Sequence, residues 1–341
     1  MIITINQTPV QVLDGETLIE TARRTGHDIP SLCYAKNAKH QSSCMVCIVK
    51  DCATGQFLPS CTTLPTEGMH IDTESEEVRM VRTLSLELLL SDHRADCEAP
   101  CSMVCPHGLD IERMLNLYDS GKHREAHELI AAAFALPALG CENCKAPCEK
   151  VCRRATVEQA VPIRAIIREV ISYQLQNVHF SQRNADNADN ADFHGFNEQY
   201  KKRKTNKEQF QSRLGRFTAQ EKEWLKANIA TSSGCLHCAC AGREGCKLRL
   251  YATAAGIKRP RYEASSALPA MQKERVTGNM WFEPAKCIRC GLCVYNSQNG
   301  FTFKNRGFGM QIVIPDENKE NVGDELAELC PTGALYSENL F

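Results

Sequence analysis

The cysteines are the residues of this chain most able to do chemistry. There are 20 in 341 residues, and nineteen of them fall into spaced groups separated by long stretches without cysteine. A reducing cytosol would not keep so many thiols as disulfides, so metal binding is the natural interpretation. Four thiolates hold either an iron–sulfur cluster or a structural zinc ion, and the spacing within each group has to distinguish the two.

The first group is Cys33, Cys44, Cys47 and Cys61, with the spacing C-x10-C-x2-C-x13-C. A 2Fe–2S cluster takes four thiolates, so cysteines close together in a loop can reach around it while a more distant one completes the set. The spacing therefore predicts one 2Fe–2S cluster. Cys52 lies outside the pattern, and we expect it to be a plain thiol.

The last group is Cys287, Cys290, Cys293 and the remote Cys330, which is followed by proline. Three cysteines from one loop and a fourth from a distant Cys-Pro form the pattern of a bacterial ferredoxin. Ser297 stands where a two-cluster ferredoxin would carry a further cysteine. We therefore predict a single 4Fe–4S cluster here.

A third group, Cys235, Cys238, Cys240 and Cys246, places four thiols within twelve residues. A loop this compact could wrap one 4Fe–4S cluster, whereas a zinc site usually pairs two knuckles across a longer gap. The spacing is the least specific of the four, and both iron and zinc stay open.

His93 opens the middle region, four positions before Cys97 and directly after a leucine-rich segment. This arrangement resembles the His-x3-Cys of the complex I iron–sulfur subunit and of iron-only hydrogenases, in which the histidine binds a 4Fe–4S cluster. The run Ile29–Cys33 and the long first gap of the 2Fe–2S group resemble the N-terminal ferredoxin domain of the same proteins. The resemblance implies that His93 is a cluster ligand.

The cysteine runs that follow depart from that family. They read C-x3-C-x3-C-P from Cys97 to Cys105 and C-x2-C-x3-C-x3-C from Cys141 to Cys152. They resemble the α-helical ferredoxin domain of the glutamate synthase small subunit and dihydropyrimidine dehydrogenase, in which the last cysteine of each run crosses to the other of two clusters. The resemblance implies one 4Fe–4S cluster on His93, Cys97, Cys101 and Cys152 and another on Cys105, Cys141, Cys144 and Cys148, with Glu169 as a reserve ligand.

Short elements must position these groups. Strand patterns at Ile2–Ile5 and Val10–Val12, then a helix over Glu16–Thr25, predict a β-grasp 2Fe–2S ferredoxin domain over residues 1–75. Residues 76–178 are expected to form an α-helical ferredoxin domain with two 4Fe–4S clusters. Its predicted helices are Glu77–Leu90, Ile111–Leu117, Arg124–Phe134 and Ile163–Leu175.

The second half of the chain is less regular. Residues 179–216 include a near-repeat of Asn-Ala-Asp at Asn184–Asp192 and few apolar residues, which predicts a linker. Residues 217–275 are expected to be a cysteine-rich metal-binding segment beginning with a helix at Ala219–Ile229. Residues 276–341 should form a small α+β ferredoxin-like domain with strands at Phe301–Phe303 and Met310–Ile314. The predicted fold class of the chain is α+β.

The net charge and the distribution of apolar residues exclude some classes of binding partner. A net charge of −1 argues against nucleic acid. No apolar run approaches the length of a membrane span, and no charged and apolar leader follows Met1, so we expect a cytoplasmic protein without a membrane span.

The sequence contains neither G-x-G-x-x-G nor G-x-x-x-x-G-K-[ST], so no nucleotide-binding motif is visible. We therefore predict a non-catalytic electron-transfer subunit of an oxidoreductase complex, with one 2Fe–2S and three to four 4Fe–4S clusters. The expected partners are a flavoprotein subunit linked to NAD(P)H and a hydrogenase, formate dehydrogenase or ferredoxin. A stand-alone reductase with its own substrate site and a zinc-stabilised scaffold protein stay open as alternatives.

Overall fold

Two compact units make up the computed structural model. It describes residues 1–94, 96–134, 141–181, 219, 222–223, 232–240, 245–257, 261–262, 273–298 and 300–337. Unit 1 combines Met1–Arg94 with the described part of Ala241–Phe341, and unit 2 holds the described residues from Asp96 to Cys240. The predicted linker at 179–216 and the predicted helix at 219–229 lie almost entirely outside the described residues.

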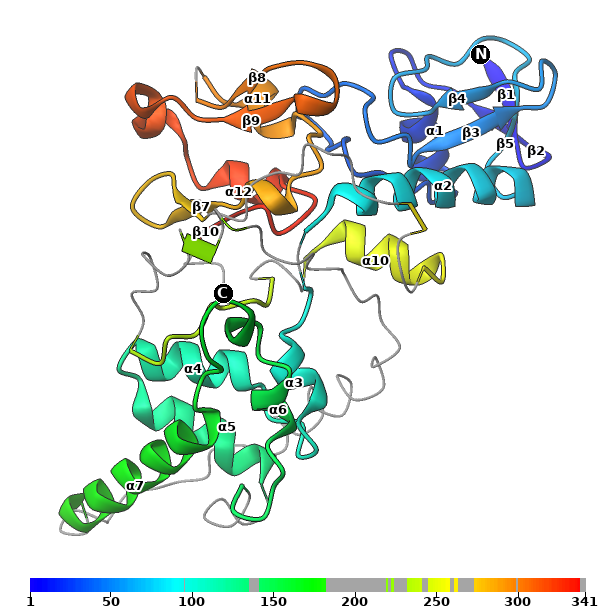
Figure 1. Cartoon of the computed structure of the whole chain (residues 1–341). Coiled ribbons are helices and arrows are strands. Elements are labelled where there is room, and N and C mark those ends of the chain that lie inside the picture. The colour runs from blue at the N-terminus through cyan, green and yellow to red at the C-terminus, as the bar shows by residue number, and fades with distance from the viewer. Residues whose placement is uncertain are drawn as a thin grey trace. The chain divides into compact units, whose positions relative to one another are not determined.

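A five-stranded mixed sheet forms the N-terminal part of unit 1 (Figure 1). Its order is β2-β1-β5-β3-β4, with β1 and β5 parallel and the other neighbours antiparallel. Alternation along β1 buries Ile3 and Ile5, because successive side chains point to opposite faces of a sheet. The strands are β1 (Ile2–Ile5), β2 (Thr8–Gln11), β3 (Ile48–Asp51), β4 (Phe57–Pro59) and β5 (His70–Asp72).

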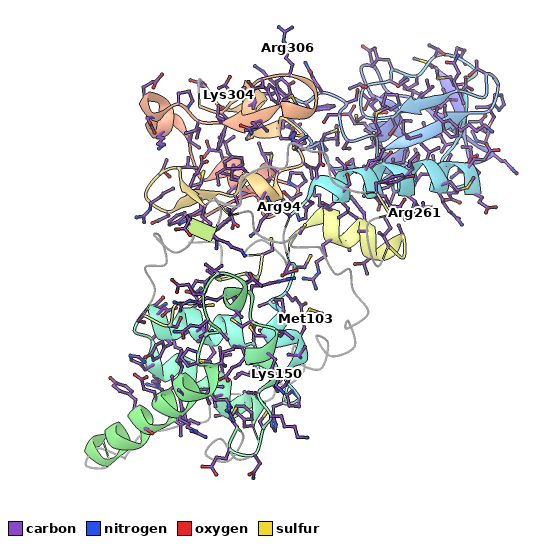
Figure 2. All side chains as sticks on the ribbon, viewed as in Figure 1. Arg94, Met103, Lys150, Arg261, Lys304 and Arg306 are labelled. Carbon is purple, nitrogen blue, oxygen red and sulfur yellow. The ribbon has the colours of Figure 1, made fainter. Side chains whose placement is uncertain are left out.

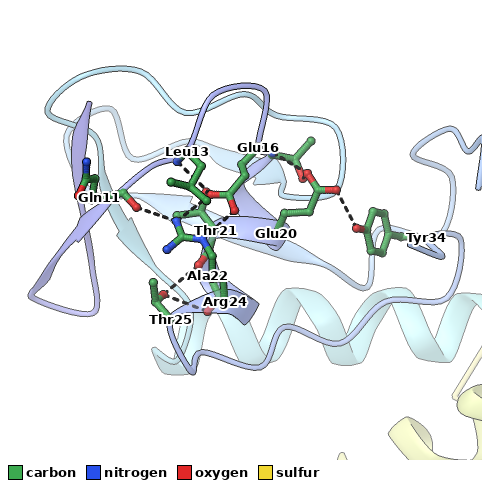
Figure 3. Close-up of polar contacts among 10 residues, drawn as sticks. Gln11, Leu13, Glu16, Glu20, Thr21, Ala22, Arg24, Thr25 and Tyr34 are labelled. Atoms are coloured by element: carbon green, nitrogen blue, oxygen red, sulfur yellow. Dashed lines mark hydrogen bonds and ion pairs between the residues drawn. The ribbon is translucent and has the colours of Figure 1, made fainter. Parts of the chain in front are cut away.

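Helix α1 (Leu18–Arg24) supplies an apolar stripe to this core and carries a polar network on its other side (Figure 3). The Glu20 carboxylate accepts hydrogen bonds from the backbone N–H and the hydroxyl of Thr17, both at 2.8 Å, and so caps the start of the helix. Glu20 also accepts a hydrogen bond from the Tyr34 hydroxyl at 3.0 Å. This bond ties the helix to the residue that follows Cys33.

Glu16 and Arg24 close the same network, with guanidinium–carboxylate distances of 2.7 and 2.8 Å. Hydrogen bonding from Arg24 lowers the pKa of Glu16 to about 2 from an ordinary value of 4.5. The stability that the ionised carboxylate contributes is therefore present above pH 4.5 and is lost as the pH falls towards 2.

Glu16→Gln should accordingly lower the free energy of unfolding at pH 7 by about 0.5–1 kcal/mol. The stability of the variant should then fall less than that of the wild type when the pH is lowered. The measurement is the temperature at which the visible circular dichroism of the predicted 2Fe–2S site is lost, at pH 7 and at pH 4. The exposed Asp14, replaced with Asn, is the matched control. Equal shifts for the two variants at pH 7 would contradict the role assigned to Glu16.

Helix α2 (Glu76–Asp92) is capped at its start by Ser75, whose hydroxyl accepts the backbone N–H of Val78, and at its end by His93. Helix α10 (Lys247–Ala254) packs against α2 within unit 1. Arg261, labelled in Figure 2, forms an ion pair at 2.6 Å with Glu87 of α2. Helix α2 thus contacts residues that lie more than 150 positions later in the sequence.

The C-terminal part of unit 1 consists of short elements around its own apolar core. Its centre includes Met280, Phe282 and Phe301. Lys304 and Arg306 project from the outer end of the β8–β9 hairpin (Figure 2). The strands are β6 (Glu274–Arg275), β7 (Met280–Phe282), β8 (Thr302–Lys304), β9 (Gln311–Val313) and β10 (Leu335–Ser337), and the helices are α11 (Leu292–Asn296) and α12 (Glu325–Leu329).

Unit 2 is helical in its described residues. Its core combines Met114 and Leu115 of one helix with Ile130 and Val170 of two others, all at most 1% exposed. Three buried cysteines, Cys101, Cys105 and Cys148, belong to the same core. The helices are α3 (Pro100–Val104), α4 (Ile111–Asp119), α5 (His123–Ala133), α6 (Pro147–Lys150) and α7 (Ile163–Ser181).

The four helices predicted for residues 76–178 are confirmed, with ends that differ by a few residues. No helix among the described residues has the length and apolar character needed to cross a membrane.

Candidate metal centres

The first predicted group comes together in unit 1, in the loops beside α1 and β3. Cys47 directly precedes β3, and Cys61 follows β4 by two residues. All four thiols are buried, with exposed fractions from 0% at Cys61 to 4% at Cys44. The Ser60 hydroxyl donates to the carbonyl of Cys47 at 2.7 Å, which fixes the two cysteine segments to each other.

Hydrogen bonds link the four thiols of this group. Bonds from Cys44 and Cys61 hold the pKa of Cys33 below its ordinary value. A hydrogen bond with Cys61 lowers the pKa of Cys47 to about 6. The same bonds raise the pKa of Cys44 and of Cys61. Four sulfurs close enough to form hydrogen bonds with one another suit a cluster that all four would share.

The last predicted group lies in the C-terminal part of unit 1. Arg289 and Gly291 lie between its first three cysteines in left-handed conformations, with φ of 57° and 79°. A Cβ on Gly291 would lie only 2.7 Å from the Tyr295 ring, so glycine is required there. The turn directs the backbone N–H of Arg289 to the Sγ of Cys287 at 3.3 Å, the kind of bond that tunes a cluster's potential.

Burial raises the pKa of Cys287 to about 12. Burial also raises the pKa of Cys290 and Cys293, with further increases from the charges of neighbouring cysteines that include Cys330. Thiols in this environment lose their protons when a metal binds, so assembly of the site releases protons.

The loop that carries Cys44 docks onto helix α11, next to the last group. The Ser43 hydroxyl donates to the carbonyl of Cys290 at 3.4 Å. Lys39 and Asn296 exchange two hydrogen bonds, of 2.9 and 2.8 Å. Two of the predicted sites therefore lie side by side in unit 1, although about 250 residues separate the contacting segments.

Unit 2 brings together a second cysteine set, Cys105, Cys141, Cys144 and Cys148. Burial, followed by the charges of Cys144 and Cys105, raises the pKa of Cys141 to about 11. Burial raises the pKa of Cys148 to about 12, and charges on Cys105 and Cys141 contribute. The guanidinium of Arg164 donates to the carbonyl of Cys144 at 3.1 Å and holds the loop in place.

His93 lies at the end of α2 in unit 1 and is 8% exposed. A ring N–H donates a hydrogen bond to the backbone of Lys286. Its Nδ1 is buried and has no hydrogen-bond partner among the residues that the structure describes. Histidine ligands of metals commonly bind the metal with one ring nitrogen while the other donates to a carbonyl. These observations are consistent with His93 binding a cluster through Nδ1. Its role as a ligand stays a prediction.

Cys101 and Cys152 of the predicted His93 set lie in unit 2 beside Cys235 and Cys238 of the predicted third group. All four line one cavity. Cys240 is in unit 2 as well, whereas Cys246 belongs to unit 1, where its Sγ accepts the N–H of Arg249 at 3.4 Å and caps α10. The cavity thus brings together cysteines that the sequence analysis had placed in two separate groups.

Polar residues that the sequence analysis did not single out hold the Cys235 loop onto helix α4. Asp119, at the end of α4, accepts hydrogen bonds from Ser232 at 2.8 Å and from Ser233 at 2.7 and 2.6 Å. Burial alone would raise the pKa of Asp119, but hydrogen bonds from His237 and Ser233 hold it at about 2. Nothing in the spacing of these residues would have revealed the contact.

The reserve ligand Glu169 is engaged elsewhere, since its Oε1 accepts the Tyr118 hydroxyl at 2.9 Å. Cys52 is exposed in a turn after β3, as expected for a plain thiol.

Two family models match the chain. Residues 1–76 match a 2Fe–2S iron–sulfur cluster binding domain. Residues 87–179 match dihydropyrimidine dehydrogenase domain II, which carries a 4Fe–4S cluster. The chain contains iron–sulfur domains. The resemblance of its first half to iron–sulfur electron-transfer proteins is thereby confirmed.

Relatives with known roles match part of this chain. NADP-reducing hydrogenase subunit HndD of Solidesulfovibrio fructosivorans is 32% identical over 44% of this chain and 27% of its own length. The NADPH-Fe(3+) oxidoreductase subunit alpha of Geobacter sulfurreducens is 26% identical over 37% of this chain and 14% of its own. The mitochondrial NADH-ubiquinone oxidoreductase 78 kDa subunit of Candida albicans is 28% identical over 38% of this chain and 17% of its own. The chain thus spans about a quarter or less of these relatives.

A solved structure of NAD+-reducing [NiFe]-hydrogenase in the H2-reduced state is also similar in fold. The TM-score is 0.50 with 14% sequence identity, over 99% of this chain and 87% of that chain.

Proposed function

We propose that this chain is a multi-cluster electron-transfer subunit. It would relay single electrons between an NAD(P)H-linked flavoprotein and a second redox protein, namely a hydrogenase, a formate dehydrogenase or ferredoxin. The observation that carries the proposal is the pair of four-cysteine sites that lie side by side in unit 1. Iron–sulfur clusters supply one-electron chemistry over a wide range of potentials, and neighbouring sites provide a route for it.

In the finer assignment, residues 1–75 are a β-grasp ferredoxin domain, residues 76–178 an α-helical ferredoxin domain, and residues 276–341 a small ferredoxin-like domain. The mixed sheet with α1 supports the first, and the helical core of unit 2 supports the second. The short strands and helices around the last cysteine group support the third.

Three kinds of group in the chain would contribute to electron transfer. Cysteine thiolates hold the irons, and backbone N–H groups such as that of Arg289 stabilise charge on the sulfurs. Apolar residues pack around the cysteines of the last group in unit 1 and around those of unit 2. The Ser43–Cys290 contact keeps the two sites of unit 1 at a fixed separation.

Metal analysis of the anaerobically purified chain tests the proposal. We expect about 14 to 18 irons per chain with little or no zinc, according to whether three or four 4Fe–4S clusters accompany the 2Fe–2S cluster. About 14 irons with one zinc would leave a single zinc site in the chain. Few irons with several zinc ions would contradict an electron carrier and favour a zinc-stabilised scaffold.

Reduction by a pyridine nucleotide separates a carrier from a stand-alone reductase. NAD(P)H should reduce the purified chain only when a flavoprotein oxidoreductase is added, with bleaching of the visible absorption as the readout. Bleaching by NAD(P)H alone would indicate that the chain has its own nucleotide site.

A further inference from the structure

We propose that Cys235 and Cys238 complete, together with Cys101 and Cys152, the ligand set of a 4Fe–4S cluster in unit 2. The inference rests on the proposed iron–sulfur function and adds two ligands from a segment that neither matched domain includes. It also assigns iron rather than zinc to the Cys235 loop.

One cavity in unit 2 is lined by all four cysteines. Cys101 lies on α3, and Cys152 follows α6. Apolar groups of Ala99, Leu115 and Val161 form other parts of its wall. Four thiols around one mostly apolar space are the surroundings that a cubane cluster requires.

The electrostatics of the thiols agree with this proximity. Burial raises the pKa of Cys101, and the charges of Cys235 and Cys152 raise it further. Burial raises the pKa of Cys238 well above its ordinary value, and the charges of Cys235, Cys101 and Cys152 add to the effect. The Cys101 and Cys238 thiols therefore lie close enough to the other cysteines of the proposed set to be affected by their charge.

The loop that carries Cys235 and Cys238 is held against the helices by specific contacts. His237 is bound through both ring nitrogens, to Glu112 at 3.2 Å and to Asp119 at 3.4 Å, and so serves as an anchor. Gly234 has φ of 68°, and a Cβ there would collide with the guanidinium of Arg154. The left-handed backbone at this position favours glycine, and the arginine side chain fills the space that a Cβ would take.

Backbone N–H groups already point at two sulfurs of the set. The N–H of His237 donates to the Sγ of Cys235 at 3.4 Å, and the N–H of Val161 donates to the Sγ of Cys152 at 3.5 Å. Hydrogen bonds of this kind stabilise the charge on cluster sulfurs. Arg153 and Arg154 also line the cavity, where Arg153 pairs with Asp96 at 3.2 Å and Arg154 with Glu158 at 3.1 Å.

The test compares single and double variants of the full chain, purified anaerobically. Cys101→Ser and Cys235→Ser should each abolish the same EPR signal of the reduced protein and remove about four irons per chain. The double variant should lose no more than either single variant. Cys52→Ser, at an exposed thiol, should lose nothing.

A loss of about eight irons in the double variant, or two different missing signals, would overturn the proposal. So would the loss of zinc from Cys235→Ser. If no iron is found in the wild-type chain, the proposed function itself fails. If iron is present and Cys235→Ser keeps all of it, only this inference fails.

Differential alkylation of the wild-type chain gives the same answer without relying on a variant that folds. Cys101, Cys152, Cys235 and Cys238 should become reactive together as the iron is lost stepwise by oxidation, with mass spectrometry as the readout. Exposure of Cys235 and Cys238 in a different step from Cys101 and Cys152 would contradict a shared cluster.

Discussion

Replacing Cys47 with alanine should remove the 2Fe–2S cluster completely, with the loss of about two irons per chain. Cys47 is 1% exposed and lies in the hydrogen-bonded set with Cys33, Cys44 and Cys61. Its removal leaves one iron with an incomplete set of ligands and leaves three buried thiols around a void. Electron transfer through this part of unit 1 should stop.

Iron analysis and the EPR spectrum of the reduced protein measure this effect, and 4Fe–4S signals should persist. The control is Cys52→Ala, only five positions away but exposed and outside the set. A 2Fe–2S signal of normal intensity in the Cys47→Ala protein would exclude Cys47 from the ligands.

Replacing Cys148 with alanine should have the second large effect. Cys148 is 7% exposed, belongs to the apolar core of unit 2 and lies in the field of Cys105 and Cys141. Loss of this ligand should remove about four irons. Helix α6 has only four residues, so we expect the segment around it to lose its order with the cluster.

Iron content, far-ultraviolet circular dichroism and the thermal stability of the helical signal together measure this change. Lys150→Ala is the matched control, because Lys150 lies exposed on the same helix (Figure 2). Equal iron contents for the Cys148→Ala and Lys150→Ala proteins would show that Cys148 is not a ligand.

Local pattern made the helices predictable, and it is also the basis of the two candidate sites of unit 1. Each of these sites draws most of its cysteines from one loop, so their spacing is visible in a short stretch of sequence. Apolar periodicity likewise placed helices such as Ile111–Asp119, although their ends depend on caps that tertiary contacts can shift.

Long-range pairing could not be predicted in the same way. Strand β5 has only three residues, and its parallel partner β1 lies at the other end of the first domain, so no local signal announces the pair. The proximity of Cys235 to Cys101 is supported by the hydrogen bonds of Asp119 with Ser232 and Ser233, which exist only in the folded chain. For that reason, the spacing of the cysteines predicted a metal site formed by the Cys235 loop alone.

Unit 1 combines Met1–Arg94 with the described part of Ala241–Phe341, so its second segment is made well after its first. At about 5–20 residues per second, a ribosome reaches Cys330 roughly 15 to 50 seconds after Cys61. During that interval the loop around Ser43 has been made, but its docking surface on α11 has not. The four cysteines of the first site are therefore all made before the surface on α11 against which their loop packs.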